Sequence, residues 1–301
     1  MHMTTRHWAL LIILSILWGG AFFFAAIAVK ELPPLTLVFC RVFIAALSLY
    51  IFLKISGQKL PSDAKIWAAF LVMGLLNNII PFSLLFWAQT TISSGLASIL
   101  NATTPIFSIL VAHFVLADER ITFNKFIGVL LGFIGVAVLL GGAALTSSNL
   151  AIMSIVACLA AALSYGFAGV FGRRFKRLGI KPSVSAFGQL TGSSVLMLPL
   201  IIVFDQPWTL SLPSQTALLS VLTLAIVSTA IAYLIFFNLL ASVGAVNVML
   251  VTLLVPVSAI ILGSLFLDEQ LETRHYLGMS LILLGLIAVD GRLLPKRAKN
   301  S

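Results

Sequence analysis

Long apolar segments separated by short polar connections run along the whole chain. Each segment is long enough to cross a hydrocarbon layer of about 30 Å, which takes roughly 20 helical residues. The pattern predicts ten membrane-spanning helices, at 8–29, 36–53, 66–89, 94–117, 123–141, 150–172, 184–204, 214–238, 244–267 and 274–292. The boundaries near 90–93 and 239–243 are the least sharply defined, because the first connection is very short and the second carries no charge.

One stretch of the chain occurs twice. Residues 94–139 align with residues 244–289 at an offset of 150 or 151. Each copy has an apolar segment with an internal proline, a short acidic connection, and a second apolar segment with glycines at helical spacing. The matched positions are Pro105 with Pro256, Asp118-Glu119 with Asp268-Glu269, Gly128 with Gly278 and Gly135 with Gly285. The chain is therefore an internal duplication.

In this interpretation residues 1–142 form the first copy and residues 150–301 the second, with five helices each. Because five is an odd number, the second copy must begin on the opposite side of the membrane from the first. Inverted repeats of this kind let two similar halves expose a site near the midplane to either side in turn. The predicted fold is an all-α integral membrane protein, with ten transmembrane helices arranged as two inverted five-helix repeats.

The composition supports a membrane protein and excludes a soluble domain. Hydrophobic residues make up 60% of the chain and charged residues only 9%, whereas about a quarter of a soluble domain is charged. The net charge of +9 comes from basic residues in short connections, so it does not indicate a nucleic-acid partner. No GxxxxGK[ST] sequence for ATP phosphates is present. We expect no cofactor and no metal.

The basic residues also predict the orientation, since cytoplasmic connections are rich in lysine and arginine. A cytoplasmic N-terminus leaves only Lys30 and Arg274 outside. It places fifteen basic residues inside, namely Arg6, Lys54, Lys59, Lys65, Arg120, Lys125, Arg173, Arg174, Lys176, Arg177, Lys181, Arg292, Lys296, Arg297 and Lys299. Both termini are then cytoplasmic, and the chain is a multi-pass protein of the plasma membrane, which is the inner membrane in a bacterium.

Polar side chains within the apolar segments are the candidates for a substrate cavity, because such residues in a membrane must face protein or water. The segment 94–117 carries Ser94, Ser98, Asn101, Thr104 and Ser108 on one face. For the serines we favour hydrogen bonding between packed helices. For Asn101 and Thr104, beside Pro105 at mid-helix, cavity lining and helix packing are both consistent with the sequence.

Two adjacent amides, Asn77 and Asn78, lie at the middle of the third segment, where they are costly to bury without partners. At an offset of 151, Asn77-Asn78 and Phe82 correspond to Ser228-Thr229 and Tyr233, and Trp18-Gly19 corresponds more weakly to Tyr165-Gly166. The hypothesised wall residues are Trp18, Asn77, Asn78, Phe82, Asn101, Thr104, Tyr165, Thr229, Tyr233 and Asn247. Pro105 and Pro256 each free a backbone carbonyl, and we expect them to act as hinges.

Arg41 is the only strong charge inside an apolar segment. Either it extends to the membrane interface, or it serves as a partner for a substrate carboxylate or as a gate residue. No Asp or Glu falls inside a helix core, which favours uncoupled transport over proton coupling. One arginine is too few for a phosphate-bearing substrate. Amides, hydroxyls and aromatic rings suit a small neutral or zwitterionic metabolite.

The paired pattern of proline, acidic pair and glycines resembles the drug/metabolite transporter superfamily, and specifically its EamA branch of paired five-helix repeats. The resemblance extends over nearly the whole chain. It implies a transporter rather than an enzyme, exporting small neutral metabolites and in the first place amino acids, including aromatic ones. The partners are then a small-molecule substrate and the lipid bilayer, while the oligomeric state stays open.

Three alternatives compete with this interpretation. The first is a proton-coupled multidrug or metabolite efflux carrier, although the intramembrane glutamate of the small multidrug exporters in the superfamily has no counterpart here. The second is an intramembrane enzyme, which would need convergent acid, base or metal groups in the core. The third is a membrane sensor that kept the fold and lost transport, since a fold does not fix a function.

Overall fold

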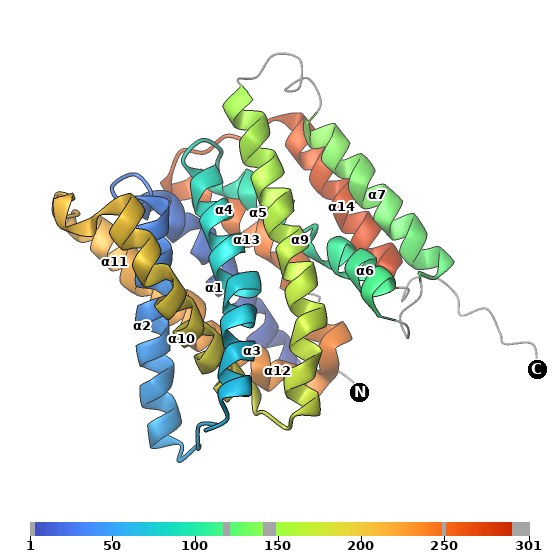
Figure 1. Ribbon diagram of the computed structural model, residues 1–301. Coiled ribbons are helices and arrows are strands. Elements are labelled where there is room, and N and C mark those ends of the chain that lie inside the picture. The colour runs from blue at the N-terminus through green and yellow to red at the C-terminus, as the bar shows by residue number, and fades with distance from the viewer. Residues whose placement is uncertain (1–3, 117–120, 141–148, 249–250, 291–301) are drawn as a thin grey trace, which may run out of the picture.

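The computed structural model describes residues 4–116, 121–140, 149–248 and 251–290, and every regular element in this part of the chain is a helix (Figure 1). The α-helices are α1 (Thr5–Ala28), α2 (Pro34–Ile55), α3 (Ala64–Gly74), α4 (Ile80–Gln89), α5 (Ser94–Asn101), α6 (Thr104–Val115), α7 (Phe123–Leu140), α9 (Asn149–Arg177), α10 (Pro182–Leu200), α11 (Gln215–Ala225), α12 (Ala232–Val248), α13 (Val251–Phe266) and α14 (Thr273–Asp290). The π-helical segments are η1 (Leu75–Ile79), η2 (Ile201–Asp205) and η4 (Ile226–Ile231), and η3 (Pro207–Thr209) is a short 3-10 turn.

The helices confirm a multi-pass membrane protein. Each of the ten apolar segments expected from the sequence overlaps a helix. Within the described residues, seven helical stretches are long and apolar enough to span a membrane: Thr5–Ala28, Pro34–Ile55, Ala64–Gln89, Ser94–Val115, Asn149–Arg177, Pro182–Asp205 and Gln215–Leu239. Three shorter apolar helices accompany them, at Phe123–Val138, Leu254–Phe266 and Thr273–Ala288.

One predicted helix boundary is wrong. The sequence predicts an end between residues 239 and 243, but α12 continues through this stretch to Val248. No glycine, proline or charge interrupts the chain just before Gly244, so nothing there stops the helical hydrogen bonding. The acidic pair of the first copy, Asp118-Glu119, lies outside the described residues.

The helix that contains η1 changes its hydrogen bonding around a proline. The amide of Ile80 bonds to the carbonyl of Leu75, five residues back. Pro81 follows directly and has no N–H, so it cannot continue the helical ladder. The carbonyl of Leu76 accepts a hydrogen bond of 2.7 Å from the Ser164 hydroxyl of α9. A neighbouring helix therefore satisfies part of the backbone that the π-helical turn exposes.

The segment η4 lies at the corresponding place in the second half of the chain, at an offset of 151 from η1. Here the hydroxyl of Thr229 donates to the carbonyl of Leu224, five residues back, at 2.8 Å. Single π-helical turns inside α-helices are frequent at functional sites. Both turns lie where the sequence places its matched polar pairs.

A break separates α5 from α6 just before Pro105. Because Pro105 has no N–H, the carbonyl of Asn101 loses its helical partner. The Thr104 hydroxyl donates to this carbonyl at 2.7 Å, and the Thr103 hydroxyl donates to the carbonyl of Leu100 at 2.6 Å. Side chains thus satisfy the interrupted backbone, as a broken helix inside a membrane protein requires.

The matching proline of the second copy behaves differently. Pro256 lies inside α13, which is uninterrupted from Val251 to Phe266. The two prolines predicted as equivalent hinges therefore have different local structures, a break at Pro105 and a continuous helix at Pro256.

The matched glycines form the crossing of α7 with α14, which lie side by side in Figure 1. A Cβ on Gly135 would stand 2.8 Å from the carbonyl oxygen of Gly278, and one on Gly285 would stand 2.6 Å from that of Gly128. Each glycine pair therefore lets one helix backbone touch the other, and the two contacts are reciprocal. Small residues at such crossings are the usual means of close helix packing in membranes.

Two further glycines allow close helix crossings, Gly19 between α1 and α13 and Gly166 between α9 and α6. A Cβ on Gly19 would lie 2.5 Å from Ser258 of α13, and one on Gly166 of α9 would lie 3.1 Å from the backbone of Phe107 in α6. Neither position has room for a side chain. These crossings fix the residues just before them, Trp18 and Tyr165, which are discussed below.

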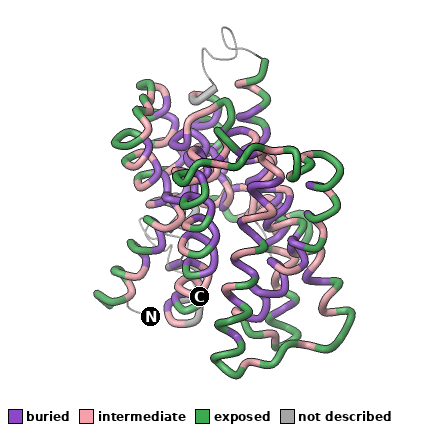
Figure 2. The backbone as a smooth tube through the Cα atoms, turned by 90° about the vertical axis from the view of Figure 1, so that its left-hand side faces the viewer, coloured by how far each residue is buried: buried purple, intermediate pink, exposed green. Residues whose placement is uncertain are grey.

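The two ends of the helix bundle differ in charge. Most described basic residues gather at one end, which we call the basic end: Arg6, Lys54, Lys59, Lys65, Lys125, Arg173, Arg174, Lys176, Arg177 and Lys181. The α2–α3 and α9–α10 connections of this end lie at the lower edge of Figure 1. Figure 2 shows buried residues along the inner faces of the helices and exposed ones on the outer faces, which are largely apolar.

We expect Gly285→Ala to lower the stability of the detergent-solubilised protein by about 1–3 kcal/mol, the usual cost of overpacking. The added methyl group would overlap the Gly128 carbonyl. Thermal unfolding measures the loss. Gly169→Ala is the matched control, because no atom lies within 4 Å of its Cβ position. Equal melting temperatures for both variants would contradict the close crossing.

Candidate functional site

A central cavity of about 890 Å³ lies between helices from both halves of the chain. Its wall includes residues of α1, α2, α3, α4, α5, α6, α9, α10, α12 and α13, and Lys125 at the start of α7. Its volume falls in the range of about 300–1,000 Å³ that is typical of small-molecule sites. The glycine crossing of α7 with α14 lies outside this wall.

Seven of the ten hypothesised wall residues line this cavity: Trp18, Asn77, Phe82, Asn101, Thr104, Tyr165 and Tyr233. Asn78 and Thr229 are not among the residues of its wall, and both side chains are fully buried. The side chain of Asn247 lies outside the described residues.

Asn78 belongs to a polar layer behind the wall. Its amide nitrogen donates to the Ser193 hydroxyl of α10 at 2.9 Å, and the Tyr233 hydroxyl donates to its Oδ1 at 3.3 Å. Asn77 donates to Oε1 of Gln189 at 3.0 Å, and both of these side chains line the cavity. The two adjacent amides therefore divide their roles: Asn77 faces the cavity, and Asn78 links three helices.

Aromatic rings form much of the remaining wall. Trp18 packs against Phe236 with ring centroids 5.4 Å apart, and Tyr233 packs edge-on against Phe237 at 6.1 Å. Tyr165 lines the wall from α9. Such rings offer a large apolar contact area, while the hydroxyls of the tyrosines supply hydrogen bonds.

Arg41 is held inside the protein rather than at the membrane interface. Only 7% of its surface is exposed, and it lines the cavity. Its Nε donates to the Thr229 hydroxyl at 2.9 Å. Its guanidinium carbon lies 3.7 Å from the ring centroid of Phe82 and 5.6 Å from that of Phe86, in the geometry of a cation–π contact. The alternative that Arg41 extends to the interface is therefore wrong.

Several wall residues were missed by the sequence reasoning. Phe86 and Phe237 line the cavity, and they correspond at the same offset of 151 that relates Phe82 to Tyr233. Extending that alignment by four residues would have found them. Gln89 and Gln189 also line the wall, but no sequence pattern distinguishes these glutamines from packing residues.

The cavity is open towards the basic end and closed at the opposite end. Lys125 and Arg173 line it at the basic end and are partly exposed. Gly169, also in the wall, is exposed and faces open space. At the opposite end Gln89 is buried, and its amide donates to the carbonyl of Phe22 at 2.8 Å.

A carboxylate joins the two halves of the chain at the closed end. Glu269, after α13, accepts hydrogen bonds from the backbone amides of Ser94 and Gly95 at 2.7 and 3.1 Å. The Ser94 hydroxyl donates to it at 2.9 Å. The free N–H groups at a helix N-terminus favour an anion. A Cβ on Gly263 would collide with Glu269, so this glycine makes room for the contact.

Two further carboxylates make the same kind of contact at this end. Asp205 accepts hydrogen bonds from the amide and the hydroxyl of Thr36 at 2.7 and 2.8 Å. Glu31 accepts them from the amide and the hydroxyl of Ser214, both at 2.6 Å. The Ser214 hydroxyl and amide lower the pKa of Glu31, so its charge and this contact persist at neutral pH. We call these three carboxylate contacts the ties.

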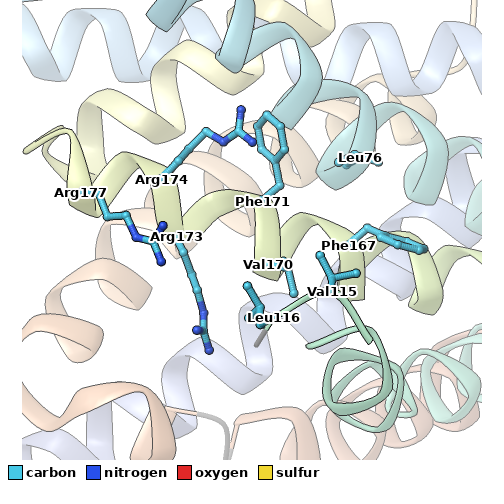
Figure 3. A pocket seen from close by; sticks show the side chains of 9 residues that line it. All are labelled: Leu76, Val115, Leu116, Phe167, Val170, Phe171, Arg173, Arg174 and Arg177. Atoms are coloured by element: carbon cyan, nitrogen blue, oxygen red, sulfur yellow. The ribbon is translucent and has the colours of Figure 1, made fainter. Parts of the chain in front are cut away.

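A smaller pocket of about 360 Å³ adjoins the cavity, and Val170 and Arg173 line both (Figure 3). Three arginines of α9 stand at one side of it and apolar side chains at the other. The Arg174 guanidinium carbon lies 3.4 Å from the ring centroid of Phe171. Among the described residues, no group of three His, Cys, Asp or Glu side chains could hold a metal ion.

A bundle of apolar helices around a central, partly polar cavity defines the class of membrane transport proteins. The chain belongs to the EamA-like transporter family, whose sequence profile matches residues 6–141 and again residues 152–289.

Curated relatives agree with this membership over nearly their whole length. The chain is 28% identical to "Uncharacterized transporter YoaV" of Bacillus subtilis, covering 92% of this chain and 94% of that protein. It is 27% identical to "Probable amino-acid metabolite efflux pump" of Escherichia coli, covering 94% of each. A solved crystal structure with 21% identity covers 93% of this chain and 96% of that one, with a TM-score of 0.66, and this likeness concerns the fold alone.

We expect Asn78→Ala to destabilise the protein by about 1–3 kcal/mol, because it removes a buried amide and leaves the buried Ser193 hydroxyl without the hydrogen bond it accepts. Asn77→Ala is the matched control, since Asn77 is only partly buried and lines the cavity. It should cost clearly less in the same thermal unfolding measurement. An equal or larger loss for Asn77→Ala would contradict the division of roles between the two amides.

Proposed function

We propose that the chain exports small neutral metabolites, in the first place amino acids including aromatic ones, by alternating access and without coupling to an ion. The observation that carries the proposal is the central cavity, whose wall combines aromatic rings, amides and one buried guanidinium. Such a wall suits a small molecule with an apolar side chain and a few polar groups. The printed name of the Escherichia coli relative, an amino-acid metabolite efflux pump, supports this substrate class.

In this proposal the chain has ten spanning helices in two inverted repeats, residues 1–142 and 150–301. Three features support it: the π-helical turns η1 and η4 at matched places, the reciprocal glycine contacts between α7 and α14, and the corresponding crossings at Gly19 and Gly166. An approximate two-fold relation between the halves accounts for all three. Such a relation is the basis of alternating access in many transporters.

The basic end is cytoplasmic in this proposal, because cytoplasmic connections are rich in lysine and arginine. Both termini then lie in the cytoplasm. The cavity faces the cytoplasm, and the three ties close the external side. Export requires these ties to separate, so that the external end opens after substrate has entered from the cytoplasm. The break between α5 and α6 near Pro105 supplies a flexible point for this motion, and Pro256 takes the corresponding place in α13.

The absence of an acidic group from the described wall supports uncoupled transport. Proton-coupled carriers commonly use a carboxylate within the membrane. The described carboxylates with inter-half contacts, Glu31, Asp205 and Glu269, bond to helix N-termini at the closed end instead. In the proposal these carboxylates keep the external end closed and do not carry a proton.

Counterflow in proteoliposomes tests the function. Vesicles that contain the purified protein are preloaded with unlabelled phenylalanine, and uptake of labelled phenylalanine is followed without any ion gradient. We expect saturable uptake that some amino acids block and others do not. Protein-free vesicles and vesicles with Gly169→Trp, which fills the open part of the cavity, are the controls.

Two results would contradict the proposal. One is uptake that no amino acid in a broad panel supports or inhibits. The other is transport that occurs only under an imposed proton gradient, which would indicate a coupled efflux carrier.

The role of the ties is tested by Glu269→Gln. A neutral amide accepts fewer hydrogen bonds from the start of α5 and interacts less with its helix dipole. We expect the external end to open more often, by about fivefold, since losing a cap costs ~1 kcal/mol. The measurement is labelling of Ala102→Cys, a buried position of the cavity wall, by an impermeant thiol reagent added from outside, with Cys40 and Cys158 replaced by alanine.

Glu272→Gln is the control for this experiment. Glu272 lies three residues away and pairs with Arg274 at 2.7 Å, and it makes no contact of the tie kind. Its labelling rate should equal that of the parent protein. An unchanged labelling rate in Glu269→Gln would mean that the Glu269 contact does not keep the external end closed.

A further inference from the structure

We propose that the cavity recognises both charges of a zwitterion: the Arg41 guanidinium binds the carboxylate, and the side-chain oxygens of Gln89 and Asn101 bind the ammonium group. This inference rests on the proposed function and specifies which groups of the substrate the cavity binds. The ligands are α-amino acids with a free carboxylate and a free amino group.

The guanidinium of Arg41 is held in place with most of its donors unused. Arginine has five N–H donors in a planar fork. Nε donates to Thr229, whose own hydroxyl hydrogen goes to the carbonyl of Leu224, so the Thr229 oxygen is an acceptor for Arg41. Within the described part of the chain, the two terminal nitrogens make no hydrogen bond. This fork matches the two oxygens of a carboxylate.

In the part of the chain that the structure describes, no carboxylate neutralises this charge. Among the described residues none lies within salt-bridge distance of Arg41, and the ionisable groups that interact with it are the hydroxyls of Tyr165 and Tyr233. A buried charge without a partner is costly, and the cation–π contact with Phe82 offsets only part of that cost. A substrate carboxylate supplies the missing negative charge.

Among the described residues of the wall, two buried side-chain oxygen atoms lack hydrogen bonds. They are Oε1 of Gln89 and Oδ1 of Asn101, and both residues line the cavity. The amide nitrogen of Gln89 donates to the Phe22 carbonyl, which fixes the orientation of the amide group. A buried acceptor without a donor lowers the stability of the protein. An ammonium group provides three donors and can satisfy both oxygens.

The two parts of this site lie on one face of α4. Phe82, Phe86 and Gln89 follow one another at spacings of four and three residues, which places them in a row along the helix. The Arg41 guanidinium lies over Phe82 and near Phe86, so Gln89 is one to two helical turns further along, roughly 5–10 Å. A single amino acid can therefore touch both groups, leaving its side chain to the aromatic wall.

The first test uses the unmodified protein and three competitors of labelled phenylalanine counterflow. Phenylalanine carries both charged groups, phenylalaninamide lacks the carboxylate, and 3-phenylpropionate lacks the ammonium group. We expect each of the last two to inhibit about tenfold to a hundredfold more weakly than phenylalanine, as the loss of hydrogen bonds to a charged group predicts. Equal inhibition by either one would overturn the inference while leaving amino-acid transport intact.

The second test combines these competitors with variants. Arg41→Gln should weaken inhibition by phenylalanine about tenfold or more and leave that by phenylalaninamide unchanged. Asn101→Leu should instead remove the preference for phenylalanine over 3-phenylpropionate. Arg174→Gln is the matched control, because Arg174 also lies over an aromatic ring but outside the central cavity, and it should change neither ratio.

Folding and function are kept apart in this design. If Arg41→Gln does not fold, Arg41→Lys keeps the charge without the planar fork and should weaken phenylalanine inhibition selectively. A loss that is equal for phenylalanine and phenylalaninamide would show that Arg41 is only structural. If the unmodified protein gives no saturable amino-acid counterflow, the proposed function itself fails. If counterflow is present but the competitors inhibit equally, only the charge recognition fails.

Discussion

Glu269 accepts hydrogen bonds from the start of α5, and through this contact the second half of the chain closes one end of a cavity that both halves line. A carboxylate at a helix N-terminus is strong enough to hold two rigid bodies together. It is also weak enough to be exchanged for water, because the free N–H groups and the anion are both well hydrated when they separate. Two more contacts of the same chemistry, at Asp205 and Glu31, lie at the same end. In the proposed mechanism these three contacts keep this end of the cavity closed.

The interior follows from the rule that every polar group within a membrane needs a partner. The carbonyls released at Pro105 and in η1 receive hydroxyl hydrogens from Thr104 and Ser164, and Asn78 is fully bonded behind the wall. Against this background the unpaired groups stand out. Among the described residues, the terminal nitrogens of Arg41 and the amide oxygens of Gln89 and Asn101 make no hydrogen bond, and these three residues line the same cavity.

The sequence predicts the helices, the duplication and most of the wall, because apolar length and a repeat offset are properties of the chain itself. It cannot show that Asn78 and Thr229 lie behind the wall, because their partners Ser193 and Arg41 are on other helices and only the packing brings them together. It also cannot show the ties or the contact of Gln89 with Phe22. These join residues far apart in the chain, and only the packing of the helices brings them together.

The central claim is that the ties hold the external end closed and separate during transport. The most direct test is the distance between spin labels on Thr90 and Gln270, two exposed residues beside Ser94 and Glu269, in a protein without other cysteines. Pulsed electron paramagnetic resonance should give one short distance in substrate-free vesicles and a second, longer one when amino acid is present. A single distance that no substrate changes would contradict the account.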